Sequence, residues 1–130
     1  MDKVVKRNEM LYRAVKRSQP DTINEDGSPT SALFKQDNGV SVDRDGGRTE
    51  DEIVETFESR FTTRFKGLFR VGANVCLDHS MAVIPADKAN EYHAEIFDDF
   101  NRTPLSSLNA LILADAAQVV TYYSSVKWSV

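Results

Sequence analysis

The stretch Glu91–Phe97 holds the residues whose types and spacing could most readily do chemistry. In a β-strand, side chains at i and i+2 point to the same face. We therefore expect His93 to share a face with Glu91 and Glu95, whose carboxylates would favour the charged imidazolium. Such a group suits general acid–base catalysis, a metal site or a solvated sheet face. The residues alone leave these three alternatives open.

Further candidates lie on two other predicted strands, residues 11–15 and 40–44. The alternation in residues 11–15 places Arg13 on one face with Leu11 and Val15, although a short helix continuing from Val4 is an alternative. We take as candidate catalytic residues His93, Glu95 and Arg13. We take as candidate binding residues Tyr12, Ser41, Asp43 and Arg44. Convergence of these side chains on one concave surface would favour an enzyme or a ligand-binding protein.

Two other groups of residues resemble chemical motifs but lack the required spacing. Cys76, Asp78 and His79 are of zinc-ligand types, yet they form no paired ligand pattern with His93 and Glu95. Gly46-Gly47 precedes a predicted helix, but three carboxylates in the first helical turn would repel a phosphate. We therefore expect neither a metal nor a resident cofactor.

Length and composition indicate one globular domain, residues 1–130, with residues 1–10 as a flexible basic arm. The chain has 130 residues, of which 41% are hydrophobic and 28% charged, as is usual for a protein with one core. A single cysteine excludes an internal disulfide framework and favours a reducing, cytoplasmic compartment. No apolar run is long enough to cross a bilayer, and no apolar segment follows the basic N-terminus as in a signal peptide.

Charge is distributed unevenly along the chain. Residues 1–17 hold six basic and two acidic residues, whereas the rest holds ten basic and eighteen acidic ones. The acidic body argues against a general nucleic-acid binder. We expect the basic segment to dock on its own body or to be solvated, and we expect a protein partner. Nucleic acid bound through the arm is a less favoured partner, and a membrane is not expected.

The predicted fold class is α+β, a small and mostly antiparallel sheet with two packing helices. Thr49 begins the first helix with the spacing of a capping box, and Phe57 and Phe61 lie on its apolar stripe. Thr103 and Pro104 begin the second helix, which we expect to end near Thr121. The remaining predictions are strands at 67–71, 74–77, 81–85 and 92–97, a hairpin at 32–44, and a final strand or tail at 122–128.

Several short segments resemble a set of small uncharacterised bacterial proteins that share the same run of motifs. The resemblance covers residues 11–120 and implies a bacterial or phage-borne cytoplasmic protein, without an activity. The segments are Leu11–Arg13, Pro29–Lys35, Val40–Arg44, Tyr92–Ile96 and Leu105–Ser107.

The chain is also similar to ADP-ribosyltransferase-like folds, which include the NAD-consuming toxins called RES. Their sites combine an arginine on an early strand, a serine in the middle of the chain and a glutamate on a late strand. The resemblance implies that Arg13 binds phosphate, that Glu95 binds ribose and that Ser41 completes the set.

The leading functional interpretation is a small binding or regulatory module that recognises another macromolecule, in a defence or toxin–antitoxin setting. The absence of a complete catalytic motif and the segregated charge favour it. The alternative is a small enzyme that acts on a nucleotide or nucleic-acid substrate. That enzyme would be ADP-ribosyltransferase-like or would use His93 and Glu95 for acid–base chemistry.

Overall fold

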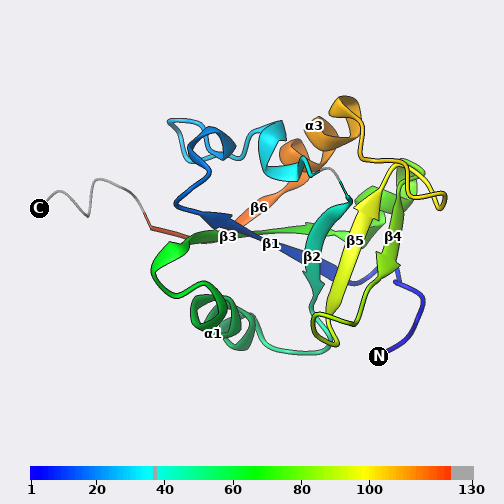
Figure 1. The fold of residues 1–130 in the computed structure, drawn as a ribbon, viewed down its shortest axis with the longest axis horizontal. Coiled ribbons are helices and arrows are strands. Elements are labelled where there is room, and N and C mark those ends of the chain that lie inside the picture. Colours follow the sequence, from blue (N-terminus) through cyan, green and yellow to red (C-terminus); the bar gives the residue numbers. More distant parts are fainter. Residues whose placement is uncertain (37, 124–130) are drawn as a thin grey trace, which may run out of the picture.

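A computed structural model describes residues 1–36 and 38–123, and its six strands form one antiparallel sheet in the order β4-β5-β2-β1-β3-β6 (Figure 1). This confirms the predicted α+β class with a small antiparallel sheet. The strands are β1 Met10–Lys16, β2 Val40–Arg44, β3 Phe65–Gly72, β4 Ala82–Pro85, β5 His93–Phe97 and β6 Gln118–Tyr122. The helices are α1 Glu50–Phe61, α2 Ala73–Asp78 and α3 Ser107–Ala116, with short 3-10 helices η1 Pro20–Thr22, η2 Ser31–Phe34 and η3 Thr62–Arg64.

The sheet opens in its middle, between β1 and β2. Strand β1 pairs with β3 over its whole length, and β2 pairs with β5 from Val40 to Asp43. Within the described residues, however, β1 and β2 pair at two positions only, Leu11↔Arg44 and Tyr12↔Asp43. Beyond Tyr12 the two strands separate, and Figure 1 shows β2, β5 and β4 running in a different direction from β1, β3 and β6. The sheet is therefore split into two three-stranded halves.

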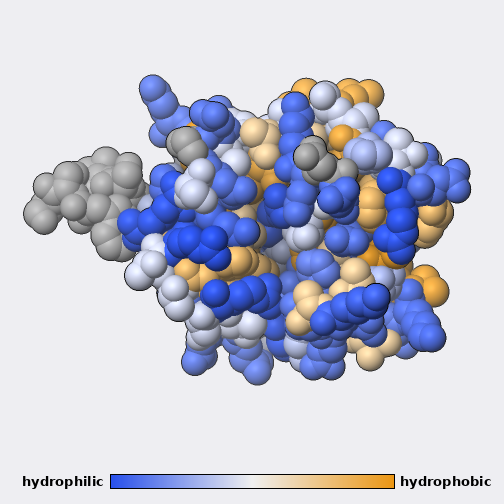
Figure 2. Space-filling model, viewed as in Figure 1, coloured by the Kyte–Doolittle hydropathy of each residue, from blue (hydrophilic) through white to orange (hydrophobic). Residues whose placement is uncertain are grey.

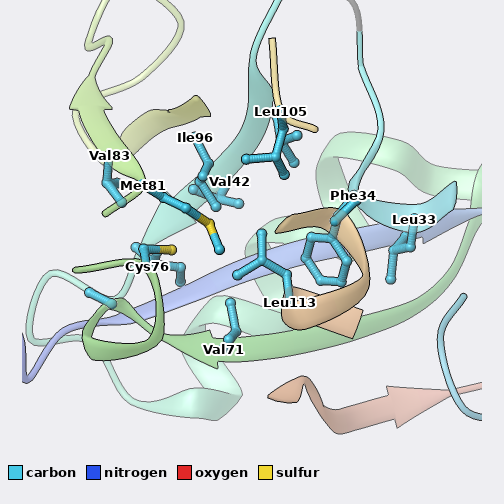
Figure 3. Packing of buried hydrophobic residues seen from close by; sticks show 14 of the residues in the cluster. Leu33, Phe34, Val42, Val71, Cys76, Met81, Val83, Ile96, Leu105 and Leu113 are labelled. Carbon is cyan, nitrogen blue, oxygen red and sulfur yellow. The ribbon is translucent and has the colours of Figure 1, made fainter. Parts of the chain in front are cut away.

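Each face of the sheet carries an apolar core. The larger core lies beneath η2, α2 and α3, where Figure 3 shows Leu113 and Phe34 together, with Val71 of β3 below them. The smaller core joins α1 to the opposite face through Ile53 and Phe57. Burial of apolar side chains on both faces stabilises the fold by roughly 25 cal/mol for each Å² of apolar surface removed from water. The helices therefore hold the two halves of the sheet from opposite sides.

Helix α1 begins as the sequence predicts. The Thr49 side chain accepts a hydrogen bond from the Glu52 amide at 3.2 Å, and the Glu52 carboxylate accepts one from the Thr49 amide at 3.0 Å. Phe57 is 3% exposed and is buried as predicted. Phe61 packs against the smaller core but is only half-buried, so the prediction that it is buried is wrong. It is the last residue of the helix, and cationic side chains approach the part of its ring that the core leaves uncovered.

Residues 74–77, predicted to form a strand, belong to helix α2. Apolar runs of this length do not distinguish a strand from a buried helical turn. The turn buries Ala73 and Cys76 on one side, which is what a helix of this length can do. A third helix is therefore present beside the two that were predicted.

The predicted hairpin over residues 32–44 is also wrong. Residues 31–34 form η2, and β2 pairs with β1 and β5. The hairpin prediction treats Gly39 as a turn residue, but the structure gives this glycine a packing role. Its φ is +94°, and a Cβ there would lie 2.5 Å from the Phe97 ring, so the glycine serves close packing against β5. Asp37, within the predicted turn, lies outside the described residues.

Helix α3 is shorter at both ends than predicted. Ser106 caps it by accepting a hydrogen bond from the Asn109 amide at 3.2 Å. The Asp98 carboxylate accepts bonds from the Ser106 amide at 2.8 Å and the Asn109 side chain at 2.9 Å. This cluster fixes the start after Pro104. At the other end, residues 118–122 form β6; the rest of the predicted final strand, residues 124–128, lies outside the described residues.

The N-terminal segment lies on the body of the protein. Arg7 binds Asp78 at 2.6 Å, and the carbonyl of Asp2 accepts a hydrogen bond from Arg44 at 2.6 Å. These contacts support the alternative in which the basic segment docks on its own chain. In the described part of the chain, no helix has the length and apolar character needed to span a membrane.

Phe57 provides a test of the α1 interface. We expect Phe57→Ala to lower the free energy of unfolding by roughly 3–5 kcal/mol, because it leaves a cavity between α1 and the sheet. Phe100→Ala is the matched control, since Phe100 is 75% exposed. Denaturant unfolding of both variants checks this, and equal midpoints for Phe57→Ala and the wild type would contradict the position of α1.

Cys76 provides a test of the larger core. Burial raises the pKa of its thiol to about 12, and its side chain is fully buried. Since the thiolate is the reactive form, we expect no labelling by a thiol reagent at neutral pH in the folded protein. Complete labelling should follow denaturation. Rapid labelling under native conditions would mean that α2 is open.

Candidate functional site

A pocket of about 410 Å³ lies between α1 and the sheet, at the opening between β1 and β2. Its volume is within the range of small-molecule binding sites. Its walls combine aromatic, cationic and hydrogen-bonding side chains. The main lining residues are Tyr12, Arg13, Lys16, Ser41, Asp43, Phe57, Arg60, Phe61 and His93.

The structure brings most of the candidate site residues to this pocket. In the β2–β5 ladder, Asp43 lies directly opposite His93, and Ser41 lies directly opposite Glu95. All four therefore share the α1 face of the sheet, with Glu95 beside Ser41 at the margin of the pocket. The candidates that line the pocket itself are Tyr12, Arg13, Ser41, Asp43 and His93.

The carboxylate facing His93 is Asp43, which the sequence did not indicate. Strand β5 begins at His93, so Glu91 lies in the preceding turn and the predicted alternation fails for it. The Arg44 amide donates to the Tyr92 carbonyl at 2.8 Å, which makes the neighbouring Asp43–His93 pair a non-hydrogen-bonded one. Side chains approach most closely at such pairs. His93 and Asp43 are therefore close neighbours on the pocket floor.

Asp43 is held by a fork of hydrogen bonds from α1. Its two carboxylate oxygens accept bonds from Arg60 at 2.9 and 3.3 Å, and its side chain is 2% exposed. Arg48 lies 4.0 Å away and stacks on the Tyr92 ring at 3.5 Å. The ion pair between β2 and α1 fixes the Asp43 carboxylate and neutralises it.

Arg13 bridges the opening of the sheet. Its guanidinium donates to the carbonyl of Leu33 at 2.8 Å, to the carbonyl of Ser41 at 2.9 Å and to the Gln36 side chain at 3.2 Å. None of these acceptors is charged, and burial lowers the pKa of Arg13 to about 10. These hydrogen bonds connect β1 to β2 and η2 where no backbone ladder joins the two strands. They also leave the positive charge of Arg13 beside the pocket.

Glu95 and Arg44 differ in accessibility. Arg102 lies 3.9 Å from Glu95 and is 57% exposed, so this ion pair is weak and easily displaced. Arg44 lies on the opposite face of the sheet, where its guanidinium donates to Glu9 at 2.7 and 2.9 Å. It is 2% exposed and does not reach the pocket.

Among the main lining residues named above, four are not candidates from the sequence: Lys16, Phe57, Arg60 and Phe61. Arg60 follows Phe57 by one helical turn in α1, so its side chain lies beside the apolar stripe. That adjacency was the available signal. The direction in which α1 crosses the sheet decides whether Arg60 reaches β2, and no local pattern encodes that direction.

In the part of the chain that the structure describes, no three His, Cys, Asp or Glu side chains gather as a metal site would require. Comparisons with protein-family models, with curated proteins and with solved structures found no match for this chain.

The Asp43–Arg60 pair can be tested by a double-mutant cycle. We expect Arg60→Gln to cost roughly 1–3 kcal/mol of unfolding free energy, because it leaves the Asp43 carboxylate buried without its main partner. The cycle with Asp43→Asn should give a coupling energy of at least about 0.5 kcal/mol. Arg102→Gln, at an exposed pair, is the control and should change stability by less than about 0.5 kcal/mol. Additive effects at Asp43 and Arg60 would contradict the bidentate pair.

Proposed function

We propose that this protein is an ADP-ribosyltransferase-like enzyme that binds NAD in the pocket between α1 and the sheet and cleaves it. The observation that carries the proposal is the arrangement of Arg13, Ser41 and Glu95. These residues come from β1, β2 and β5, which are neighbours in the sheet. Arg13 donates to the Ser41 carbonyl at 2.9 Å, and Ser41 lies opposite Glu95 in the ladder.

This arrangement supports the proposal because the resemblance to ADP-ribosyltransferase-like folds implies the same three residues as one set. They are far apart in the sequence, and each lies on a different strand. Arg13 acts as a positioning residue that holds the Ser41 segment while keeping its charge near the ligand. Glu95 reaches a ligand that extends from the pocket toward β5 once Arg102 is displaced.

The chemistry requires a carboxylate beside the ribose. Cleavage breaks the bond between ribose C1′ and the nicotinamide nitrogen, and the electron pair leaves with nicotinamide. Positive charge develops on the ribose, and Glu95 would stabilise it. In hydrolysis, the oxygen of water bonds to C1′, and the released proton passes to a base. His93, on the same face of the sheet as Glu95, is the candidate base. NAD is the consumed substrate, so the enzyme needs no resident cofactor.

The walls of the pocket suit a nucleotide. The rings of Tyr12 and Phe57 offer apolar surface, and Lys16 and Arg13 supply positive charge on a chain of net negative charge. Pockets with apolar walls and a few placed polar groups are typical of small-molecule sites. An NAD-consuming activity would also suit a defence or toxin–antitoxin setting.

The test is the release of nicotinamide from NAD, measured by chromatography. We expect Glu95→Gln to lower the rate by about 10²-fold or more, because it removes the charge that stabilises the transition state. Arg13→Lys should also lower the rate, since lysine lacks the planar fork that reaches the carbonyls of Leu33 and Ser41. Glu91→Gln, a neighbouring exposed carboxylate, is the matched control and should keep the wild-type rate.

A circular dichroism melt of each variant separates loss of activity from loss of fold. A wild-type protein that neither binds NAD nor releases nicotinamide would overturn the proposal. So would a Glu95→Gln variant with the full rate.

A second candidate function is the binding of another protein, and one observation favours it. Leu108 and Leu111 of α3 are 68% and 48% exposed, and Val119 of β6 is 59% exposed. Figure 2 shows apolar side chains over the α3 end of the molecule. Exposed apolar residues that lie close together are typical of interaction surfaces. A binding role at this surface does not conflict with an enzymatic pocket under α1.

A further inference from the structure

The ring of Phe61, at the end of α1, is surrounded by cations from three elements. The Lys16 ammonium lies 4.6 Å from the ring centroid, and the guanidinium carbons of Arg64 and Arg60 lie at 5.8 and 5.9 Å. Lys16 comes from β1, Arg64 from η3 and Arg60 from α1. Phe61 and Lys16 both line the pocket, so the cluster stands at its rim.

Within the described residues, the positive charge of this cluster is balanced only in part. Arg60 is neutralised by Asp43, at 2.9 Å. Among the described residues, no carboxylate forms an ion pair with Lys16 or Arg64. Burial, and after it the charges of Arg13 and Arg64, lowers the pKa of Lys16. Like charges that gather without a counter-ion cost free energy, which a bound anion would recover.

Cation–π contacts alone do not account for the arrangement. One cation over an aromatic ring contributes about 0.5–1 kcal/mol at an exposed site. Lys66 over Tyr122, at 5.6 Å, shows such a pair, with no second cation at the ring among the residues that the structure describes. Around Phe61, a second and a third cation add mutual repulsion to the attraction that each cation has for the ring.

We propose that Lys16 and Arg64 form an anion subsite at the rim of the pocket that holds a phosphoryl group of the ligand. An ammonium and a guanidinium together match the two negative charges of a diphosphate, such as the one that joins the two halves of NAD. The guanidinium can bind two phosphate oxygens, and the ammonium acts as a point charge. Phe61 keeps the two cations apart and provides the apolar wall beside them. Only the assignment of this phosphate to NAD rests on the proposed function; the subsite itself does not.

The experiment measures binding of inorganic phosphate and of pyrophosphate by NMR titration of the full chain. Saturable shifts should appear at residues around Phe61. Lys16→Gln and Arg64→Gln should each weaken pyrophosphate binding about tenfold or more, as expected for the loss of a charged hydrogen bond. Lys66→Gln is the matched control, because it removes a lysine that also lies over an aromatic ring.

The possible results separate the two proposals. Pyrophosphate binding that Lys16→Gln and Arg64→Gln both weaken, and that Lys66→Gln leaves unchanged, establishes the subsite, even if NAD is not cleaved. Equal weakening by all three variants would mean general screening of charge and would overturn the subsite. Absence of saturable shifts at Phe61 would also overturn it, whereas nicotinamide release that depends on Glu95 would still support the enzyme.

Discussion

The early separation of β1 from β2 is the constraint on which the pocket and its chemistry depend. A continuous ladder between these strands would close the sheet under α1 and leave no room for a ligand. The strands share two residue pairs and then diverge, so the backbone of β2 needs other partners. Arg13 donates to the Ser41 carbonyl, and the Gln36 side chain accepts from the Ser41 amide at 3.1 Å. Side-chain hydrogen bonds therefore satisfy the backbone of β2 where its pairing with β1 ends.

An ion pair also fixes the position of β2 relative to α1. The Asp43–Arg60 pair ties β2 to α1, while Ile53 and Phe57 fix α1 on β1 and β3. Helix α1 thus spans the two halves of the sheet, attached to one by an ion pair and to the other by apolar contacts. Buried ion pairs add little net stability, because desolvation offsets much of their attraction. Their directionality is the more useful property here, because it positions the floor of the pocket.

The sequence predicts this structure well where the pattern is local. The capping box at Thr49, the buried Phe57 and the strands around residues 11–15, 40–44 and 92–97 need only nearest neighbours along the chain. It predicts poorly where tertiary contacts decide. The run 74–77 becomes a helix because its core side is covered by other elements, and Gly39 serves packing rather than a hairpin.

The candidate site shows the same division. Strand alternation correctly separates Arg13 from Tyr12 and joins His93 to Glu95. The pairing of His93 with Asp43 depends on the register between β2 and β5, and the contribution of Arg60 depends on the path of α1. Neither is encoded in a short window of sequence.

The sign of the charge at the pocket is opposite to that of the whole chain. The protein has a net charge of −4, yet the charged residues that line the pocket are the cations Arg13, Lys16 and Arg60 and a single carboxylate, Asp43. Lys16 and Arg13 lose favourable solvation there, as the lowered pKa of each shows. Such an arrangement weakens the free protein, because a cation without a counter-ion is less stable when it is desolvated. At the anion subsite proposed above, a bound anionic ligand would lower the free energy of such a cation. The positive charge of these residues would also attract an anion to the pocket of a chain whose net charge is negative. The same few residues would therefore lower the stability of the free protein and favour the binding of an anion.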